Sequence, residues 1–186
     1  MTRLPIVLVV AAFLFACNNE KKTDDSAAKP EEKKEAVAIA YPYKASYSSD
    51  FSMGDANHAK MVLDLYKMWE DGKVDDFKSL LADSASIDFP DGNKFKDNTA
   101  DSLISFAKQF RKSLSSVKLM FDGWMPVHAN DAKDDYVLVW YREYETNMMG
   151  KVDSIRGHAY FQIKNNKIRS WSEFQQKLTP PAPAKK

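Results

Sequence analysis

Apolar side chains recur every three or four positions in three segments, a period that is typical of helices packed on a core. Asp55 can cap the first helix, and Gly72 is placed to end it. The third helix can begin at Thr99 or at Asp101. The predicted helices cover about residues 56–71, residues 74–81 and a segment that reaches Leu114.

The period changes to two in the second half of the chain, which is the pattern of β-strands. Asn165 and Asn166 form a favourable two-residue turn between the last two strands. A shorter strand-like segment precedes the third helix, and residues 94–96 can pair back onto it. The order predicts an α+β fold that ends in a four-strand antiparallel meander. The predicted strands cover residues 84–89, 117–127, 136–146, 155–163 and 168–175.

The register across the turn at residues 165–166 decides which side chains meet in the last hairpin. A regular two-residue turn places His158 opposite Glu173, and Tyr160 opposite Trp171, on the face away from the core. One interpretation is a catalytic pair, in which the carboxylate orients the imidazole as a general base. The interpretation that we favour is a polar cross-strand pair on the outer face, where Tyr160 and Trp171 belong to a homodimer interface.

The register of the preceding hairpin depends on the length of the turn that contains Gly150. A two-residue turn puts Arg142 and Tyr144 on the interior face, near its open end. An arginine beside aromatic rings can bind an anionic group, although a long arginine side chain often reaches solvent instead. A three-residue turn would direct Tyr141 and Glu143 inwards in their place.

Tryptophans complete the candidate pocket. Trp69, Trp124 and Trp140 are bulky enough to fill a space between helices and sheet or to line a ligand site within it. Filling of the core is the more common role of such residues. Together with Arg142 and Tyr144 they make up the pocket that we expect.

The first residues have the pattern of a secretory signal. Arg3 supplies a positive charge, and the apolar run up to residue 16 is too short to span a bilayer. The run ends with Leu-Phe-Ala before Cys17, the only cysteine in the chain. This ending resembles the lipobox of bacterial lipoproteins, which implies a lipid anchor on Cys17 in a bacterial cell envelope. Asn18 favours the outer membrane by the rules of that family, on either its periplasmic or its outer side.

Composition divides the rest of the chain. Residues 17–50 are charged and poor in apolar side chains, so we interpret them as a disordered tether, and residues 179–186 as a disordered tail. The folded domain is then residues 51–178. Lys and Arg number 27 against 26 Asp and Glu, so the charge gives no general attraction to nucleic acid. One cysteine excludes an intramolecular disulfide or a cysteine-based zinc cluster, and no motif indicates another metal or a cofactor.

Several short motifs follow one another along residues 55–177. They are Trp69-Glu70-Asp71-Gly72, Leu80-Leu81-Ala82-Asp83, Val137-Leu138-Val139-Trp140, Gly150, Gly157, and the segment 161–168 that leads to Trp171. Their order resembles the NTF2-like superfamily, which includes ketosteroid isomerases, scytalone dehydratase and SnoaL-like polyketide cyclases. The resemblance implies a cone in which three N-terminal helices pack on a curved four- to six-strand antiparallel sheet, with an apolar pocket between them.

Catalytic members of that superfamily carry Asp, Tyr or His groups inside the cone, and Glu173 is the nearest acidic counterpart on the last strand. Because this match is loose, we expect a lipid-anchored envelope protein that binds a small apolar or amphipathic ligand, or a protein partner. One alternative is a SnoaL-like isomerase, cyclase or hydrolase of a small carbonyl compound, and another is a structural dimerisation module. An ionisable group buried in the apolar cone would favour the enzyme. A neutral lining would favour binding.

Overall fold

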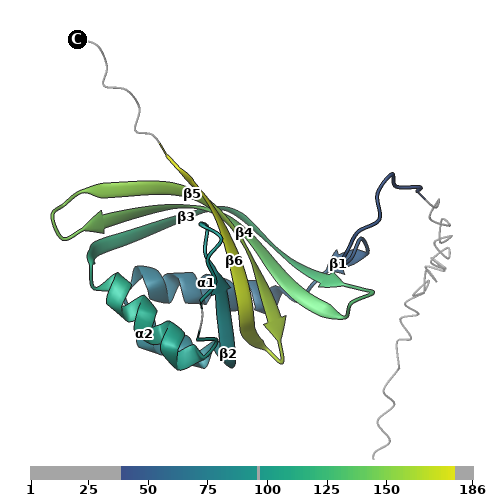
Figure 1. The fold of residues 1–186 in the computed structure, drawn as a ribbon, viewed down its shortest axis with the longest axis horizontal. Coiled ribbons are helices and arrows are strands. Elements are labelled where there is room, and N and C mark those ends of the chain that lie inside the picture. Colours follow the sequence, from purple (N-terminus) through teal and green to yellow (C-terminus); the bar gives the residue numbers. More distant parts are fainter. Residues whose placement is uncertain (1–38, 96, 179–186) are drawn as a thin grey trace, which may run out of the picture. The chain divides into compact units, whose positions relative to one another are not determined.

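A computed structural model describes residues 39–95 and 97–178 of the protein. The signal segment, Cys17, residues 18–38 of the expected tether and the tail from residue 179 lie outside the described residues. The elements are β1 (Phe51–Met53), α1 (Ala56–Glu70), a short 3-10 helix η1 (Val74–Ser79), β2 (Leu81–Asp88), α2 (Ala100–Arg111), β3 (Leu114–Ala129), β4 (Asp134–Asn147), β5 (Val152–Lys164) and β6 (Lys167–Lys177) (Figure 1).

The helix boundaries agree with the capping residues in the sequence. The Asp55 carboxylate accepts a hydrogen bond of 2.8 Å from the Asn57 amide at the start of α1. The Thr99 hydroxyl accepts one of 3.3 Å from the Ser102 amide at the start of α2. Gly72 follows α1 with a φ of 73°, which favours glycine after a helix end. The second predicted helix is the 3-10 helix η1, so residues 39–95 and 97–178 contain two α-helices where three were expected.

The sheet contains six strands in the order β1-β3-β4-β5-β6-β2. Neighbouring strands are antiparallel, except that β2 runs parallel to β6. The expected antiparallel sheet is therefore wrong in this respect, and the sheet is mixed. The expected short hairpin is reduced to one bridge between Asp88 and Lys94, and β2 pairs with β6 at Leu81 and again over residues 86–88. Periodicity identifies a strand, but it does not identify its neighbour in the sheet.

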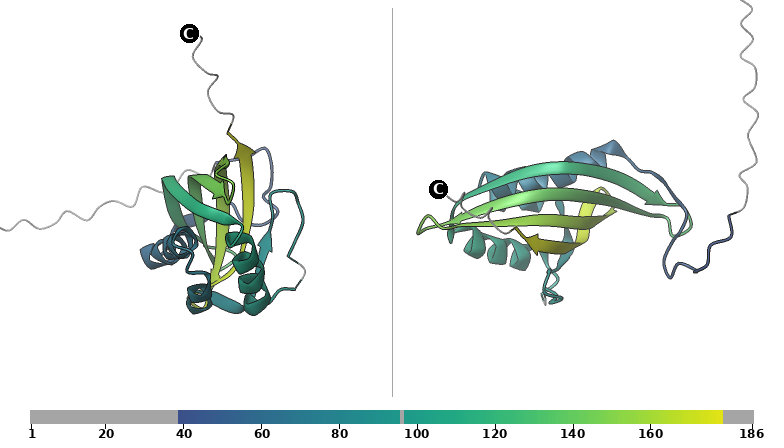
Figure 2. Two further views of the ribbon diagram at one scale, coloured as in Figure 1. Left: turned by 90° about the vertical axis from the view of Figure 1, so that its left-hand side faces the viewer. Right: turned by 90° about the horizontal axis from the view of Figure 1, so that it is seen from above.

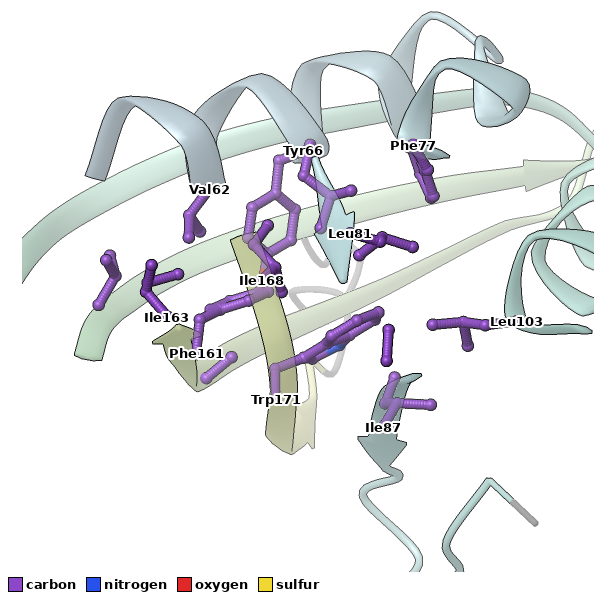
Figure 3. Close-up of a cluster of buried hydrophobic side chains, with 14 of the residues drawn as sticks. Val62, Tyr66, Phe77, Leu81, Ile87, Leu103, Phe161, Ile163, Ile168 and Trp171 are labelled. Carbon is purple, nitrogen blue, oxygen red and sulfur yellow. The ribbon is translucent and has the colours of Figure 1, made fainter. Parts of the chain in front are cut away.

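The helices cover the concave face of the curved sheet (Figures 1 and 2). The core lies between these two layers and is dominated by aliphatic and aromatic side chains. Tyr66 of α1 points from the helix layer towards Phe161 of β5, with ring centroids 5.7 Å apart (Figure 3). Before the sheet, Tyr47 donates a hydrogen bond of 2.6 Å to Asp134, so packed structure begins ahead of residue 51.

Both registers of the central hairpins depart from the regular turns that we favoured. A three-residue loop at residues 148–150 joins β4 to β5, and the Asn147 amide donates a hydrogen bond of 2.9 Å to the Lys151 carbonyl. As the alternative register requires, Gly157 consequently pairs with Tyr141 and not with Trp140. Between β5 and β6 the expected pair Ile163–Ile168 is present, but an irregularity follows it.

That irregularity is one extra residue, Arg169, on β6. Beyond it Phe161 pairs with Trp171 and Ala159 pairs with Glu173. A shift of one residue moves a strand's side chains to the opposite face of a sheet. The bulge therefore turns Glu173 towards the helices, and the expected His158–Glu173 pair is not formed.

Candidate functional site

A cavity of about 410 Å³ lies between the helices and the concave face of the sheet. Trp69 and Tyr66 of α1, Phe110 of α2, Phe161 of β5 and Trp171 of β6 contribute to its largely aromatic wall. Phe110 lines the cavity and is also 46% exposed, so it belongs to the open rim. The cone is therefore not filled by its own side chains.

Carboxylates from three strands also face this cavity. They are Glu143 and Glu145 of β4, Asp153 of β5 and Glu173 of β6. Strand pairing explains the grouping, because Glu145 lies directly opposite Asp153, and the two glutamates of β4 are two positions apart on one face. A largely apolar cavity with several converging acidic groups has the usual character of a ligand or catalytic site.

Glu143 is the most enclosed of these acids. It is 6% exposed, and the Trp69 indole N–H donates a hydrogen bond of 2.7 Å to its Oε1 atom. Burial raises the pKa of Glu143 to about 8, with smaller contributions from the charges of Glu145 and Glu173, whereas the hydrogen bond from Trp69 opposes the shift. The carboxyl group is thus mainly protonated at neutral pH and can donate a proton.

The position of Trp69 depends on the last turn of α2. The Arg111 guanidinium donates hydrogen bonds of 3.0 Å to the Trp69 carbonyl and 3.1 Å to the Glu70 carbonyl, at the end of α1. It also donates one of 3.1 Å to the Leu114 carbonyl. These bonds join the ends of the two helices and hold the indole over Glu143.

Glu173 lines the cavity with a side chain that is less enclosed than that of Glu143. The Trp171 indole N–H donates a hydrogen bond of 3.1 Å to its Oε1 atom, and the Gln175 amide donates one of 3.4 Å to its Oε2 atom. Its surroundings are protein on most sides, yet the side chain is only partly buried because it faces the cavity. Burial raises the pKa of Glu173 to about 7, although the indole hydrogen bond opposes the shift.

The two remaining acids differ from each other. Burial, and then the charge of Asp153, raises the pKa of Glu145, and the Arg111 charge lowers it. Asp153 is exposed at the rim, where the Lys177 ammonium lies 3.2 Å from its carboxylate. The hydrogen bond from Lys177 lowers the pKa of Asp153. Asp153 thus forms an ordinary surface ion pair with Lys177, whereas Glu145 belongs with the interior acids.

Two tyrosines adjoin the interior acids. Tyr66 lines the cavity, and its buried hydroxyl makes no hydrogen bond of regular geometry to a described residue, although the Tyr141 hydroxyl lies near enough to affect its pKa. Tyr141 is 1% exposed, and its ring lies across Gly157, where a Cβ atom would be 2.2 Å from the Tyr141 Cζ atom. Burial raises the pKa of both phenols, so both are protonated donors at neutral pH.

Three of the residues expected from the sequence line this cavity: Trp69, Trp171 and Glu173. His158 and Tyr160 lie on the outer face of the sheet, where each stacks on Phe174. The expected interface position of Trp171 is therefore wrong, since its side chain is 8% exposed and lies in the cavity wall.

The other expected pocket residues lie elsewhere. Arg142 is on the outer face, paired with Asp122 at 2.6 Å, and Tyr144 shares that face. Trp140 stacks on His158 with ring centroids 5.1 Å apart and is 39% exposed. Trp124 is 52% exposed and does not line the cavity. The three-residue turn is the physical reason for the position of Arg142, Tyr144 and Trp140.

The favoured registers placed Glu143 and Glu173 on the outer face of the sheet, but the structure places both inside, in the cavity wall. Glu143 was available from the sequence only through the alternative turn length, and Tyr66 was not singled out because it continues the apolar stripe of a helix. In the described parts of the chain, no group of three or more His, Cys, Asp or Glu residues is arranged to hold a metal ion. Nor is any described helix long and apolar enough to cross a membrane.

No model of a known protein family matches the sequence, and no curated protein does. Solved structures do resemble the chain. A SnoaL-like polyketide cyclase from Jannaschia sp. CCS1, named as putative, superposes with a TM-score of 0.55 at 13% identity, over 68% of this chain and 90% of its own. The fold is that of the NTF2-like proteins.

Two further structures support this NTF2-like fold. An epoxide hydrolase from M. tuberculosis gives a TM-score of 0.54 at 9% identity, over 64% of this chain and 82% of its own. An NTF2-like protein of unknown function from Exiguobacterium sp. 255-15 gives a TM-score of 0.53 at 16% identity, over 62% of this chain and 98% of its own. The NTF2-like fold is shared between proteins with different activities, so the function has to be argued from the cavity itself.

Proposed function

We propose that the protein is an acid–base enzyme of the isomerase, cyclase or hydrolase kind, which acts on a small carbonyl compound inside the cone. The observation that carries this proposal is Glu173, a carboxylate that faces an apolar cavity and has a pKa raised to about 7. A group with a pKa near the working pH is the most effective general base. The buried acids favour an enzyme over the binding protein that we expected from the sequence.

The neighbouring groups suggest a division of roles. Glu173 takes a proton from a carbon beside the carbonyl group, or from a water molecule, because it lines the cavity, is less enclosed than Glu143 and has a pKa of about 7. The Tyr66 phenol, which stays protonated beside Tyr141, is the hydrogen-bond donor that we assign to the oxygen on which negative charge develops. Glu143, with its pKa near 8, supplies a proton at the end of the reaction. Two acids with different environments and different pKa values are a recurrent arrangement for such chemistry.

Deuterium exchange tests this proposal without knowledge of the natural substrate. The protein is incubated with 1-tetralone or 2-indanone in D₂O, and the loss of the α-proton signals is followed by NMR. We expect Glu173→Gln to slow the protein-dependent exchange by about 100-fold, since the amide cannot act as a base. The rate should increase up to about pH 7, where Glu173 is ionised.

His158→Asn is the matched control, because His158 lies on the other face of the sheet. It should exchange at the wild-type rate. Equal rates for the wild type and Glu173→Gln would contradict the proposal.

We further propose that the enzyme is anchored to the bacterial envelope through a lipid on Cys17, most consistently with the outer membrane. The support is the apolar run that ends at Cys17, together with the charged segment that follows it. Labelling of cells with an alkyne-modified fatty acid should mark the wild type and not Cys17→Ser. Equal labelling of both proteins would exclude this anchor.

A homodimer through the outer face of the sheet is also proposed. Trp140, Tyr160 and Phe174 expose 39%, 39% and 56% of their surface there. A contiguous exposed aromatic surface is typical of an interaction site. Light scattering should give twice the monomer mass, and Phe174→Glu should reduce it to the monomer mass. A monomeric wild type at concentrations of about 100 μM would contradict this.

A further inference from the structure

The interior acids of the cavity lack a positive partner. Among the described residues, no ion pair joins Glu143, Glu145 or Glu173 to a lysine, arginine or histidine. The residues that line the cavity include no basic side chain. Only Asp153, at the rim, is paired, with Lys177. When these carboxyl groups are ionised, the cavity therefore carries a negative charge that no basic side chain of its lining compensates.

Ionised carboxylates buried in this way raise the free energy of the folded protein unless a positively charged group binds beside them. An acid without a partner in an apolar site takes up a proton, which is the reason for the raised pKa of Glu143 and Glu173. A positively charged ligand would supply the missing charge and release that proton. The Arg111 charge acts on Glu145 from the edge of the site, where three of its N–H groups donate to the carbonyls of Trp69, Glu70 and Leu114.

The rest of the wall is suited to the same kind of ligand. Trp69 and Phe110 are parallel to within 1°, with ring centroids 6.0 Å apart, and Phe161 and Trp171 are stacked at 5.6 Å. The faces of aromatic rings attract cations, most strongly where water is excluded. Both indole N–H groups already donate to Glu143 and Glu173, so the rings are held in position before a ligand binds.

We propose that the cavity selects an organic cation, a molecule with an apolar body and a tertiary or quaternary ammonium group, over uncharged or anionic molecules of the same shape. This inference rests on the proposed function, because it names the substrate class of the same cavity. An anion would meet four carboxylates, three of them without an ion pair, and no basic side chain in the lining. The arginine that we expected to bind an anion, Arg142, lies on the opposite face of the sheet.

Binding of a permanent cation should depend on pH through the groups that face it. These are Glu143, Glu145 and Tyr141 on β4, Glu173 on β6 and Tyr66 on α1, with Arg111 on α2 and the Asp153–Lys177 pair at the edge. The ionised glutamates attract the cation, whereas the tyrosines remain neutral. Affinity should therefore increase by up to about tenfold from pH 6 to pH 8, as Glu173 ionises, with release of a proton on binding below pH 7.

The test uses benzyltrimethylammonium and its uncharged carbon isostere, neopentylbenzene, with the purified full-length protein in phosphate buffer. Binding is followed by tryptophan fluorescence, since Trp69 and Trp171 line the cavity, and by calorimetry. We expect the cation to bind at least about tenfold more tightly than the isostere at pH 8. Glu173→Gln should weaken binding of the cation by about fivefold or more. Its affinity for the isostere should be unchanged, which would show that the cavity is intact.

Asp64→Asn is the matched control. It removes an exposed carboxylate of α1 that pairs with Lys60, and it should bind both probes as the wild type does. Equal or tighter binding of neopentylbenzene would overturn the cation inference and leave the proposed function standing, because that function has its own test with uncharged ketones. Binding of neither probe would overturn the cation inference, and the exchange test with ketones would then decide the proposed function by itself. Cation binding that is indifferent to Glu173→Gln and Glu143→Gln would place the cation outside the cavity and also overturn the inference.

Discussion

The two faces of the β4–β6 sheet differ in a way that reverses the usual pattern of polar and apolar side chains. On the concave face, Tyr141, Glu143 and Glu173 are enclosed beneath the helices. On the convex face, Trp140 and Phe174 are exposed and stack on His158. Residues of the same strands, one position apart, thus meet opposite environments. Acidic groups inside and aromatic groups outside indicate that both faces were shaped by what they contact, and not by stability alone.

The largest expected difference between the faces concerns the dependence of stability on pH. Glu143 has a pKa of about 8 in the folded protein and about 4.5 when unfolded, so its contribution is full below pH 4.5 and is lost as pH increases through 8. We expect the free energy of unfolding to fall between pH 5 and pH 8 by an amount on the order of 3 kcal/mol. Urea denaturation at each pH measures this decrease.

Glu143→Gln should reduce this slope, since the amide does not titrate, and leave the part that comes from Glu173, whose pKa is also raised. Asp122→Asn, on the convex face, should keep it. An unchanged slope in Glu143→Gln would mean that the concave face does not hold this acid in a low-dielectric site.

The close approach of two strands on the concave face gives the next effect. Gly157→Ala would place a Cβ atom 2.2 Å from the Tyr141 Cζ atom, so the ring must leave its position over the glycine. We expect a loss of about 3 kcal/mol in the free energy of unfolding, because displaced core rings leave poor packing behind them. Thermal and urea denaturation measure the loss.

Gly123→Ala is the control for this variant, since nothing lies within 4 Å of the added Cβ atom. It should change stability by no more than about 1 kcal/mol. Similar losses in both variants would show that the ring is not held against Gly157.

A smaller effect is expected at the indole that contacts Glu143. Trp69→Phe removes the donor of the 2.7 Å hydrogen bond, which favours the ionised carboxylate. The pKa of Glu143 should then increase above about 8, and stability at pH 9 should fall by about 2 kcal/mol, the value of a hydrogen bond to a charged group. Carbon-13 NMR of the labelled glutamate carboxyl groups follows the titration directly. A pKa that is lower than in the wild type would contradict the assignment of this bond.

The smallest effect belongs to the convex face. Arg142→Ala breaks the ion pair with Asp122, which is half exposed. Such pairs contribute less than about 1 kcal/mol, so the denaturation midpoint should change little. The titrations of Glu143 and Glu173 should also be unchanged, because Arg142 lies across the sheet from them. A shift in either titration would show that the two faces are electrostatically coupled.

Local signals in the chain predicted the elements well. Asp55 and Thr99 act as helix caps through contacts between neighbours in sequence, and Asn165 and Asn166 both have the positive φ that their turn requires. The partner of β2 was not predictable in the same way. A parallel neighbour is reached after a long crossover, and no short-range pattern records which edge of the sheet receives the strand.

The candidate site was harder to predict because it depends on two single-residue features. The bulge at Arg169 turns Glu173 inwards, and the three-residue loop before β5 does the same for Glu143. The usual preference for apolar residues inside argues against both registers, since each brings a carboxylate under the helices. Trp69 lines the cavity as expected, whereas Trp171 does so in place of its expected position at an interface. The role of both indoles as donors to these carboxylates follows only from the register.

The sequence by itself determined α1, α2 and the strands β2 to β6 in their order along the chain, because capping, turn formation and periodicity act between residues that are close along the chain. It did not predict β1. It also determined that the domain has the character of an NTF2-like cone, which the structural comparisons support. Only the tertiary structure decided which face each strand presents to the helices. One residue more or less in a turn or a bulge changes that face completely, and the packing of the whole sheet on α1 and α2 selects between the two possibilities.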